Sequence, residues 1–306
     1  MLRWRLISAA LILAVVLALM WLDYAVGPTG AWLTPLLLVM ALAATQELLD
    51  MTGGAAEDGK PRLRPVGWTV YGAVAMVVLA ASLPPTLHDA SGDSTSAVGD
   101  ERFALGPPLA ALMAGIALVM FGEVLRYKQP GGVLSSAALS VFIAAYIAVP
   151  MSFLAGLRFL GGNQLGMAAL VCAVLVVKCS DVGQYAFGRT LGRNKLAPRL
   201  SPGKTIEGAA GGLATACVVA WLGLTFLVPL IAPDAGIIIP WWQALLFGVM
   251  VALAGMLGDL AVSMIKRDTG RKDSSRWLPG LGGVLDILDS VLLAVPAAYL
   301  WWSLRE

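Results

Sequence analysis

Long apolar runs, separated by short polar or charged segments, dominate the sequence. Each run is close to the roughly 20 residues that an α-helix needs to cross the hydrocarbon core of a bilayer. The pattern therefore predicts an all-α, polytopic integral membrane protein with about nine transmembrane helices. The predicted spans are 6–24, 31–49, 66–83, 104–122, 133–153, 164–181, 206–231, 241–262 and 284–303.

The composition leaves no room for a soluble domain of any size. Of the 306 residues, 58% are hydrophobic and 13% are charged, whereas soluble proteins carry about 25% charged residues. We therefore expect one membrane domain overall, with scaffold helices in residues 1–160 and a catalytic region in residues 161–306. The catalytic region would include cytoplasmic loops 182–205 and 263–283, because ionisable residues concentrate there and the first five spans carry almost none.

The basic residues predict the orientation. With the N-terminus in the cytoplasm, all of the 21 Lys and Arg residues face the cytoplasm except Arg102, Arg158 and Arg305, as the positive-inside rule requires. We expect an integral protein of the cell (inner or plasma) membrane, with its active site facing the cytoplasm. Most tryptophans fall near predicted span ends, where they act as interfacial anchors rather than base-stacking platforms. No nucleic-acid partner is expected.

Carboxylates and lysines gather in and around the loop between the last two predicted spans. Three polar residues at i, i+4 and i+7 share one helix face before it, and two aspartates at i and i+3 share a face after it. A charge at the centre of a membrane helix costs roughly 2.5–3.5 kcal/mol, so these residues need partners. A divalent cation with phosphate ligands would supply both signs. The residues are Asp259, Ser263, Lys266, Asp286 and Asp289.

A second charged stretch, residues 178–212, begins inside the sixth predicted span. Asp181 and Tyr185 lie one turn apart, and a glycine-rich basic loop follows. Residues 201–205 (SPGKT) then open the next span, which places a lysine and free backbone amides at a helix N-terminus, a good phosphate site. It is not a P-loop, because Pro198 stands where that motif needs glycine. A basic loop attracted to lipid headgroups is the alternative. The small residues 209–212 indicate close helix packing.

Together the two stretches indicate phosphoryl or nucleotidyl transfer at a membrane surface, assisted by a metal ion. They also resemble the phosphatidate cytidylyltransferase (CDP-diacylglycerol synthase) family over about residues 175–295. The C-terminal signature of that family appears here as Gly258, Asp259, Ser263, Lys266, Arg267, Lys272, Asp273, Pro279, Gly280, Gly282, Gly283, Asp286 and Asp289. Its loop elements appear as Asp181, Gly183, Tyr185, Ser201, Pro202, Lys204, Thr205, Glu207 and Gly208.

The resemblance implies transfer of CMP from CTP to phosphatidate with Mg²⁺, giving CDP-diacylglycerol and pyrophosphate, and it suggests a homodimer. It implies catalytic roles for Asp259, Lys266, Asp286 and Asp289, and metal ligation by Asp259, Ser263 and Asp286. It implies substrate binding by Asp181, Tyr185, Lys195, Ser201, Lys204, Thr205, Arg267, Lys272 and Asp273.

Two positions depart from the family pattern: Leu281 replaces a histidine and Ile287 an arginine. We expect both to be dispensable for the chemistry, because the carboxylates and lysines are retained. Three other functions stay open. They are a CTP-dependent transferase or kinase acting on another lipid (a prenyl-ether lipid phosphate or a polyprenol), a transporter of anionic lipids, and a catalytically silent membrane scaffold.

Overall fold

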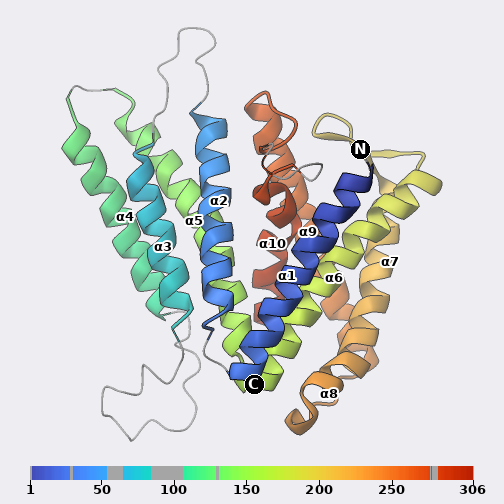
Figure 1. Cartoon of the computed structure of the whole chain (residues 1–306). Coiled ribbons are helices and arrows are strands. Elements are labelled where there is room, and N and C mark those ends of the chain that lie inside the picture. The colour runs from blue at the N-terminus through green and yellow to red at the C-terminus, as the bar shows by residue number, and fades with distance from the viewer. Residues whose placement is uncertain are drawn as a thin grey trace, which may run out of the picture. The chain divides into compact units, whose positions relative to one another are not determined.

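The computed structural model describes residues 2–27, 30–53, 65–83, 106–128, 131–275, 277 and 282–305, with side chains from residue 10 onward. Its helices fall into two compact units, which we describe separately (Figure 1). Unit 1 comprises residues 1–156 and 273–285, and unit 2 comprises residues 157–272 and 286–306. Of the residues named in the sequence analysis, Arg102, Pro279, Gly280 and Leu281 lie outside the described part of the chain.

Unit 1 holds the first helices of the chain. α3 packs along α4, and α2 packs against α3. The α3–α4 contact is close because small residues face each other: a Cβ placed on Gly122 would lie 2.5 Å from a methyl carbon of Thr69. The helices are α1 (Leu2–Val26), α2 (Leu33–Thr52), α3 (Gly67–Ala81), α4 (Gly106–Arg126) and most of α5 (Val133–Phe159).

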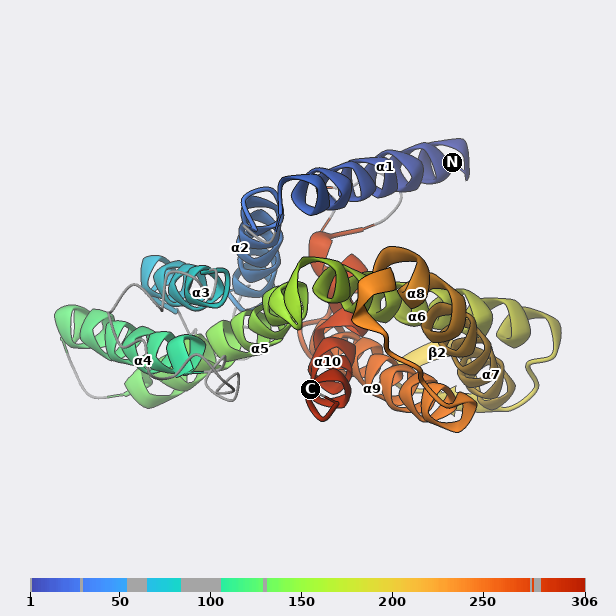
Figure 2. The same ribbon diagram turned by 90° about the horizontal axis from the view of Figure 1, so that it is seen from below.

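Unit 2 is built around α6, α7 and α9, which pack against one another (Figure 2). A two-stranded antiparallel hairpin connects α6 to α7, and a π-helical turn follows α7. The elements are α6 (Gly162–Thr190), β1 (Lys195–Ala197), β2 (Ser201–Thr205), α7 (Ile206–Leu222), η4 (Gly223–Leu227), α8 (Val228–Ile231), η5 (Pro233–Ala235), α9 (Trp241–Asp268) and α10 (Val284–Ser303).

The predicted all-α membrane fold is confirmed. Within the described residues, seven helical segments are long and apolar enough to cross a membrane. The two remaining predicted spans correspond to shorter apolar helices, Ala10–Val26 and Gly67–Ala81. The side of the membrane on which the N-terminus lies stays a prediction.

The polar connections of unit 2 are more ordered than the sequence indicated. α6 continues to Thr190 and α9 to Asp268, so the first residues of both predicted loops are helical. The hairpin pairs Lys195 with Thr205 and Ala197 with Ser201. Strands of three and five residues are too short to leave an alternating pattern in the sequence. β2 also carries a proline, a residue that sheets accept mainly in edge strands.

Glycines let the backbones of α6 and α7 approach closely. A Cβ on Gly211 would lie 2.3 Å from Cγ of Phe187, and one on Gly212 would lie 2.3 Å from Cγ of Gln184. At the same contact the hydroxyl of Ser180 donates a hydrogen bond to the carbonyl oxygen of Gly212 (3.2 Å). The predicted role of residues 209–212 in close helix packing is therefore confirmed.

We expect Gly211→Ala to destabilise unit 2, because the added methyl group would overlap the base of the Phe187 side chain. Overpacking of this kind costs about 1–3 kcal/mol. Thermal unfolding of the purified protein in detergent measures the effect. The matched control is Gly203→Ala, where an added Cβ has no neighbour within 4 Å. Equal unfolding temperatures for the two variants would contradict the proposed packing role.

Candidate active site

A partly buried ion pair joins the hairpin to α9. Nζ of Lys204, on β2, lies 2.6 Å from Oδ2 of Asp259, and the two side chains are 18% and 27% exposed. Nζ of Lys204 is itself buried and makes no hydrogen bond among the residues that the structure describes. A phosphate oxygen that reached this ammonium would therefore find N–H donors without an acceptor.

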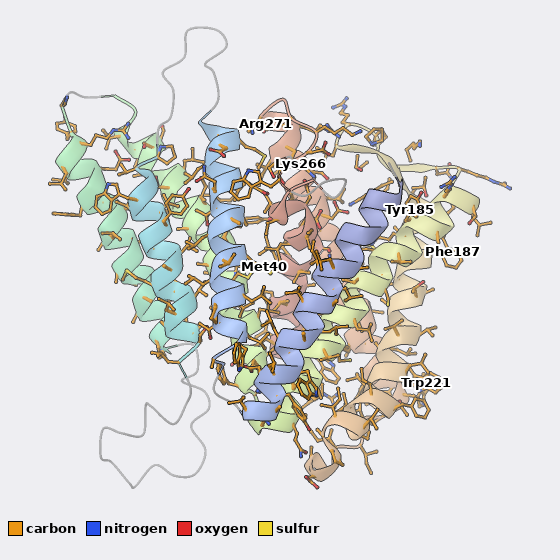
Figure 3. The ribbon with its side chains drawn as sticks, viewed as in Figure 1. Met40, Tyr185, Phe187, Trp221, Lys266 and Arg271 are labelled. Atoms are coloured by element: carbon orange, nitrogen blue, oxygen red, sulfur yellow. The ribbon has the colours of Figure 1, made fainter. Side chains whose placement is uncertain are left out.

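A second ion pair joins α9 to α10. Nζ of Lys266 donates a hydrogen bond to Oδ1 of Asp286 at 2.7 Å, and both side chains are almost completely buried. Lys266 lies in the last turn of α9, and Arg271 follows just beyond the end of that helix (Figure 3). Asp286 lies in the first turn of α10, where a negative charge is also favoured by the helix dipole.

A third cluster links α6 to α10. Nζ of Lys178 donates hydrogen bonds to the carbonyl oxygen of Ile287 (2.8 Å) and to the hydroxyl of Ser290 (3.1 Å). It also lies 3.4 Å from Oδ2 of Asp181. The hydroxyl of Ser290 donates to the same carboxylate oxygen at 2.7 Å. One lysine and one serine thus fix the position of Asp181.

Asp289, on α10, lies close to charged residues of both the first and the third cluster. Its carboxylate interacts electrostatically with Asp259 and Asp181, which carry the same charge, and with Lys178, which carries the opposite charge. The approach of α9 to α10 is close here, because a Cβ on Gly258 would lie only 2.4 Å from the carbonyl oxygen of Asp289. Carboxylates from α6, α9 and α10 therefore share one region of unit 2 with the lysines that neutralise them.

The hairpin that carries Lys204 is held by polar contacts at both ends. The carboxylate of Glu207 accepts hydrogen bonds from the backbone N–H groups of Arg193 and Asn194 at 3.0 and 3.1 Å. The hydroxyl of Thr205 caps α7 by accepting from the N–H of Gly208 (3.0 Å). Arg267 donates to the carbonyl oxygen of Leu200 (3.2 Å), which ties the hairpin to α9.

Several predicted substrate residues lie on the exposed edge of this cluster. Tyr185 is 66% exposed, accepts a hydrogen bond from Arg189 (2.9 Å) and points away from α6 (Figure 3). Lys195 and Lys272 are exposed, and Ser201 is half-buried on β2. Asp273 belongs to unit 1. One glycine of the predicted phosphate loop, Gly192, also serves packing, because a Cβ at this position would overlap the side chain of Thr205.

The sequence model of the cytidylyltransferase family matches residues 3–304 of the chain. The chain belongs to this family. It is 39% identical over 172 residues to a phosphatidate cytidylyltransferase of Mycobacterium bovis, covering 56% of this chain and 52% of that protein. It is 42% identical over 131 residues to one of Haemophilus influenzae, covering 43% and 44%.

A third relative, from Escherichia coli, is described as uncharacterized protein YnbB; it is 35% identical over 201 residues, covering 65% of this chain and 63% of that protein. The chain thus matches between 44% and 63% of the length of these curated relatives.

For this cytidylyltransferase family member, the geometry pairs the residues expected to be catalytic: Lys266 contacts Asp286, and Asp289 interacts electrostatically with Asp259. Ser263, expected to bind the metal, lies beside Asp259 (Oγ to Oδ1, 3.4 Å). Lys178 and Ser290 were not predicted as site residues. Both are polar residues inside or beside an apolar span, and this could have indicated a site, because such residues face polar partners rather than lipid.

We expect Lys266→Met to lower the stability of the protein by about 3 kcal/mol, because it removes the ammonium that pairs with the largely buried carboxylate of Asp286. The double variant Lys266→Met/Asp286→Leu removes both charges and should recover most of that loss. Thermal unfolding in detergent measures both effects, and Lys128→Met, at an exposed position, is the control. A double variant no more stable than Lys266→Met would contradict a coupled pair.

Proposed function

We propose that the protein transfers CMP from CTP to phosphatidate, releasing pyrophosphate and forming CDP-diacylglycerol. The observation that carries the proposal is the set of lysine–aspartate pairs that unit 2 holds between apolar helices, in a chain of the cytidylyltransferase family. The choice of phosphatidate is supported by the relatives that carry this name. An anionic-lipid transporter is not favoured by membership of this family.

The reaction is one displacement at phosphorus. An oxygen of the phosphatidate phosphate forms a bond to the α-phosphorus of CTP, and the bond from that phosphorus to the oxygen bridging to the β-phosphate breaks. Pyrophosphate leaves with the electron pair. Both reactants are anionic, so the protein has to bring two negative groups together and stabilise further charge on the leaving group.

Lysines are placed to meet this requirement. In the proposed mechanism Lys204 binds phosphate oxygens through the donors that it leaves unused beside Asp259. Lys266 would neutralise charge on the other side of the phosphate chain, after exchanging Asp286 for a phosphate oxygen. Exposed basic residues of the hairpin and the end of α9, among them Lys195, Arg267 and Lys272, would attract the anionic substrates.

The donor set fits Mg²⁺. Within the described residues no three metal-ligating side chains form a ready-made cluster, but Mg²⁺ on a nucleotide usually takes one or two carboxylates and completes its shell with water and phosphate. Asp259 with the neighbouring Ser263, and Asp286 on α10, would hold it. When bound, the ion would stabilise negative charge on the phosphates.

Lys178 would act as an orienting residue in this site. It holds Asp181 and Ser290 together and donates to the backbone of Ile287. It also places one positive charge near Asp289. Because Ile287 contributes only its carbonyl oxygen to these contacts, the aliphatic side chain at that position does not interrupt them.

We also propose that the site faces the cytoplasm of the cell (inner or plasma) membrane, where CTP is available and where the basic residues are expected. A homodimer stays a prediction. A prenyl-ether lipid phosphate or a polyprenol would need the same nucleotide site and a different apolar groove, so the lipid specificity is decided by assay.

Incubation of the purified protein with labelled CTP, phosphatidate and Mg²⁺ should give labelled CDP-diacylglycerol, and a chelator should abolish it. Asp259→Asn should lower kcat by at least about a hundredfold, because it removes a carboxylate that would hold the Mg²⁺ ion against the phosphates during transfer. Lys204→Met should mainly raise KM for CTP, because it removes a phosphate-binding donor.

The control is Asp234→Asn, on the exposed turn η5, where the carboxylate accepts a hydrogen bond from Gln164; it should keep wild-type rates. Turnover of another lipid but not of phosphatidate would overturn the proposed substrate. A wild-type rate in Asp259→Asn would remove this residue from the site.

A further inference from the structure

A glutamate in the region expected to be scaffold makes an extensive set of hydrogen bonds within unit 1. Glu47 lies on α2 and is 1% exposed. Its Oε1 accepts hydrogen bonds from the hydroxyl of Ser275 and the N–H of Val284, both at 2.8 Å. Its Oε2 accepts from the hydroxyl of Ser274 (2.7 Å) and the N–H of Leu285 (2.9 Å). One carboxylate therefore has four donors.

The two backbone donors are the first amides of α10. The first N–H groups of a helix have no partner inside the helix, and a carboxylate at this end also interacts favourably with the helix dipole. The two serines extend the contact to the segment that leads from α9. Glu47 thus holds both the first turn of α10 and the chain that precedes it.

Two adjacent glycines permit this arrangement. Gly282 has φ +89°, a conformation that other residues rarely adopt. A Cβ on Gly283 would lie 2.2 Å from Oε2 of Glu47 and 2.1 Å from the hydroxyl oxygen of Ser274. The glycine pair before α10 therefore turns the chain and leaves space for the carboxylate. Two glycines of the sequence signature thus have a structural role.

We infer that Glu47 is a positioning residue for the acidic groups of α10. Asp286 follows Leu285 directly and lies in the same first turn, and Asp289 and Ser290 lie one turn further along the same helix. Fixing the first two amides of the helix fixes its rotation and its axial position, and hence where these side chains point. The expected effect on catalysis rests on the proposed function, whereas the hydrogen bonds of Glu47 do not depend on it.

The carboxylate suits this task better than a neutral side chain. It offers two acceptor oxygens and no donor, and it faces four donors. A glutamine would keep one acceptor and turn an NH₂ group toward two of the donors, leaving buried polar groups unsatisfied. Each such loss shifts an equilibrium by roughly tenfold. Glu47→Gln keeps the volume of the side chain and therefore tests the hydrogen bonds rather than the packing.

The matched control is Glu123→Gln. Glu123, on α4, is also a buried glutamate that accepts a hydrogen bond from a serine, Ser136 (2.7 Å). Its hydrogen bond goes to Ser136 and not to residues 284–290 in the described part of the chain. A general effect of losing a buried carboxylate in unit 1 should appear equally in both variants, whereas an effect on α10 should appear only in Glu47→Gln.

The experiment combines amide hydrogen exchange with steady-state kinetics on the full-length protein in detergent. In Glu47→Gln, exchange of peptides covering the first turn of α10 should accelerate by about tenfold. The kcat for CDP-diacylglycerol formation should fall by about tenfold or more, with less than about a threefold change in KM for CTP, since Lys204 is untouched. Glu123→Gln should change neither quantity.

Two further variants test the inference if Glu47→Gln does not fold. Ser275→Ala removes one neutral donor and should give a smaller change in the same direction. Gly283→Ala displaces the carboxylate without altering it and should reproduce the faster exchange of α10. Agreement between these two variants supports the inference as Glu47→Gln would.

Unchanged exchange in the first turn of α10 would overturn the inference, and so would faster exchange with an unchanged kcat. If the wild-type protein makes no CDP-lipid, the proposed function fails. The exchange result then decides by itself whether Glu47 holds the start of α10.

Discussion

Opposite charges held between apolar helices are the constraint on which the candidate site depends. A lone lysine or aspartate in such surroundings is costly, and removing one member of a buried pair leaves the other uncompensated. Here the pairs join different elements: β2 to α9 through Lys204 and Asp259, and α9 to α10 through Lys266 and Asp286. The same interactions that make the charges tolerable also align the elements that carry them.

Close backbone contact makes these pairs geometrically possible. Short polar side chains reach across a helix interface only when the helices approach closely, and in membranes such an approach depends on small residues. Gly258 meets the backbone of Asp289 on α10, and Gly211 meets Phe187 on α6. Larger residues at these positions would separate the helices that bring Asp181, Asp259 and Asp289 into one region. The glycines thus shorten the distances between the charged side chains and so strengthen their interactions.

The sequence was sufficient for the spans and for most of the charged residues, because both depend on local patterns. Apolar runs of membrane length predict helices whatever they pack against, and spacing along one helix places Asp259, Ser263 and Lys266 on one face. Partners from distant segments could not be predicted in this way. Lys178 contacts Ser290 across 112 positions of sequence, and Glu47 contacts Leu285 across 238. No local pattern distinguishes Glu47 from another charge near a span end.

The pairing also bears on how substrates would enter the proposed site. Within the cluster three lysines and four aspartates nearly balance in charge, so attraction for a polyanion would come mainly from the exposed basic residues around it. A phosphate that takes Lys204 from Asp259 leaves a partly buried carboxylate without a counter-charge, which is unfavourable. A divalent cation that arrives with the nucleotide supplies that counter-charge. Binding of nucleotide and of metal would then be thermodynamically linked, each raising the affinity for the other. The ion pairs of the free protein would in this way favour the metal–nucleotide complex over either component alone.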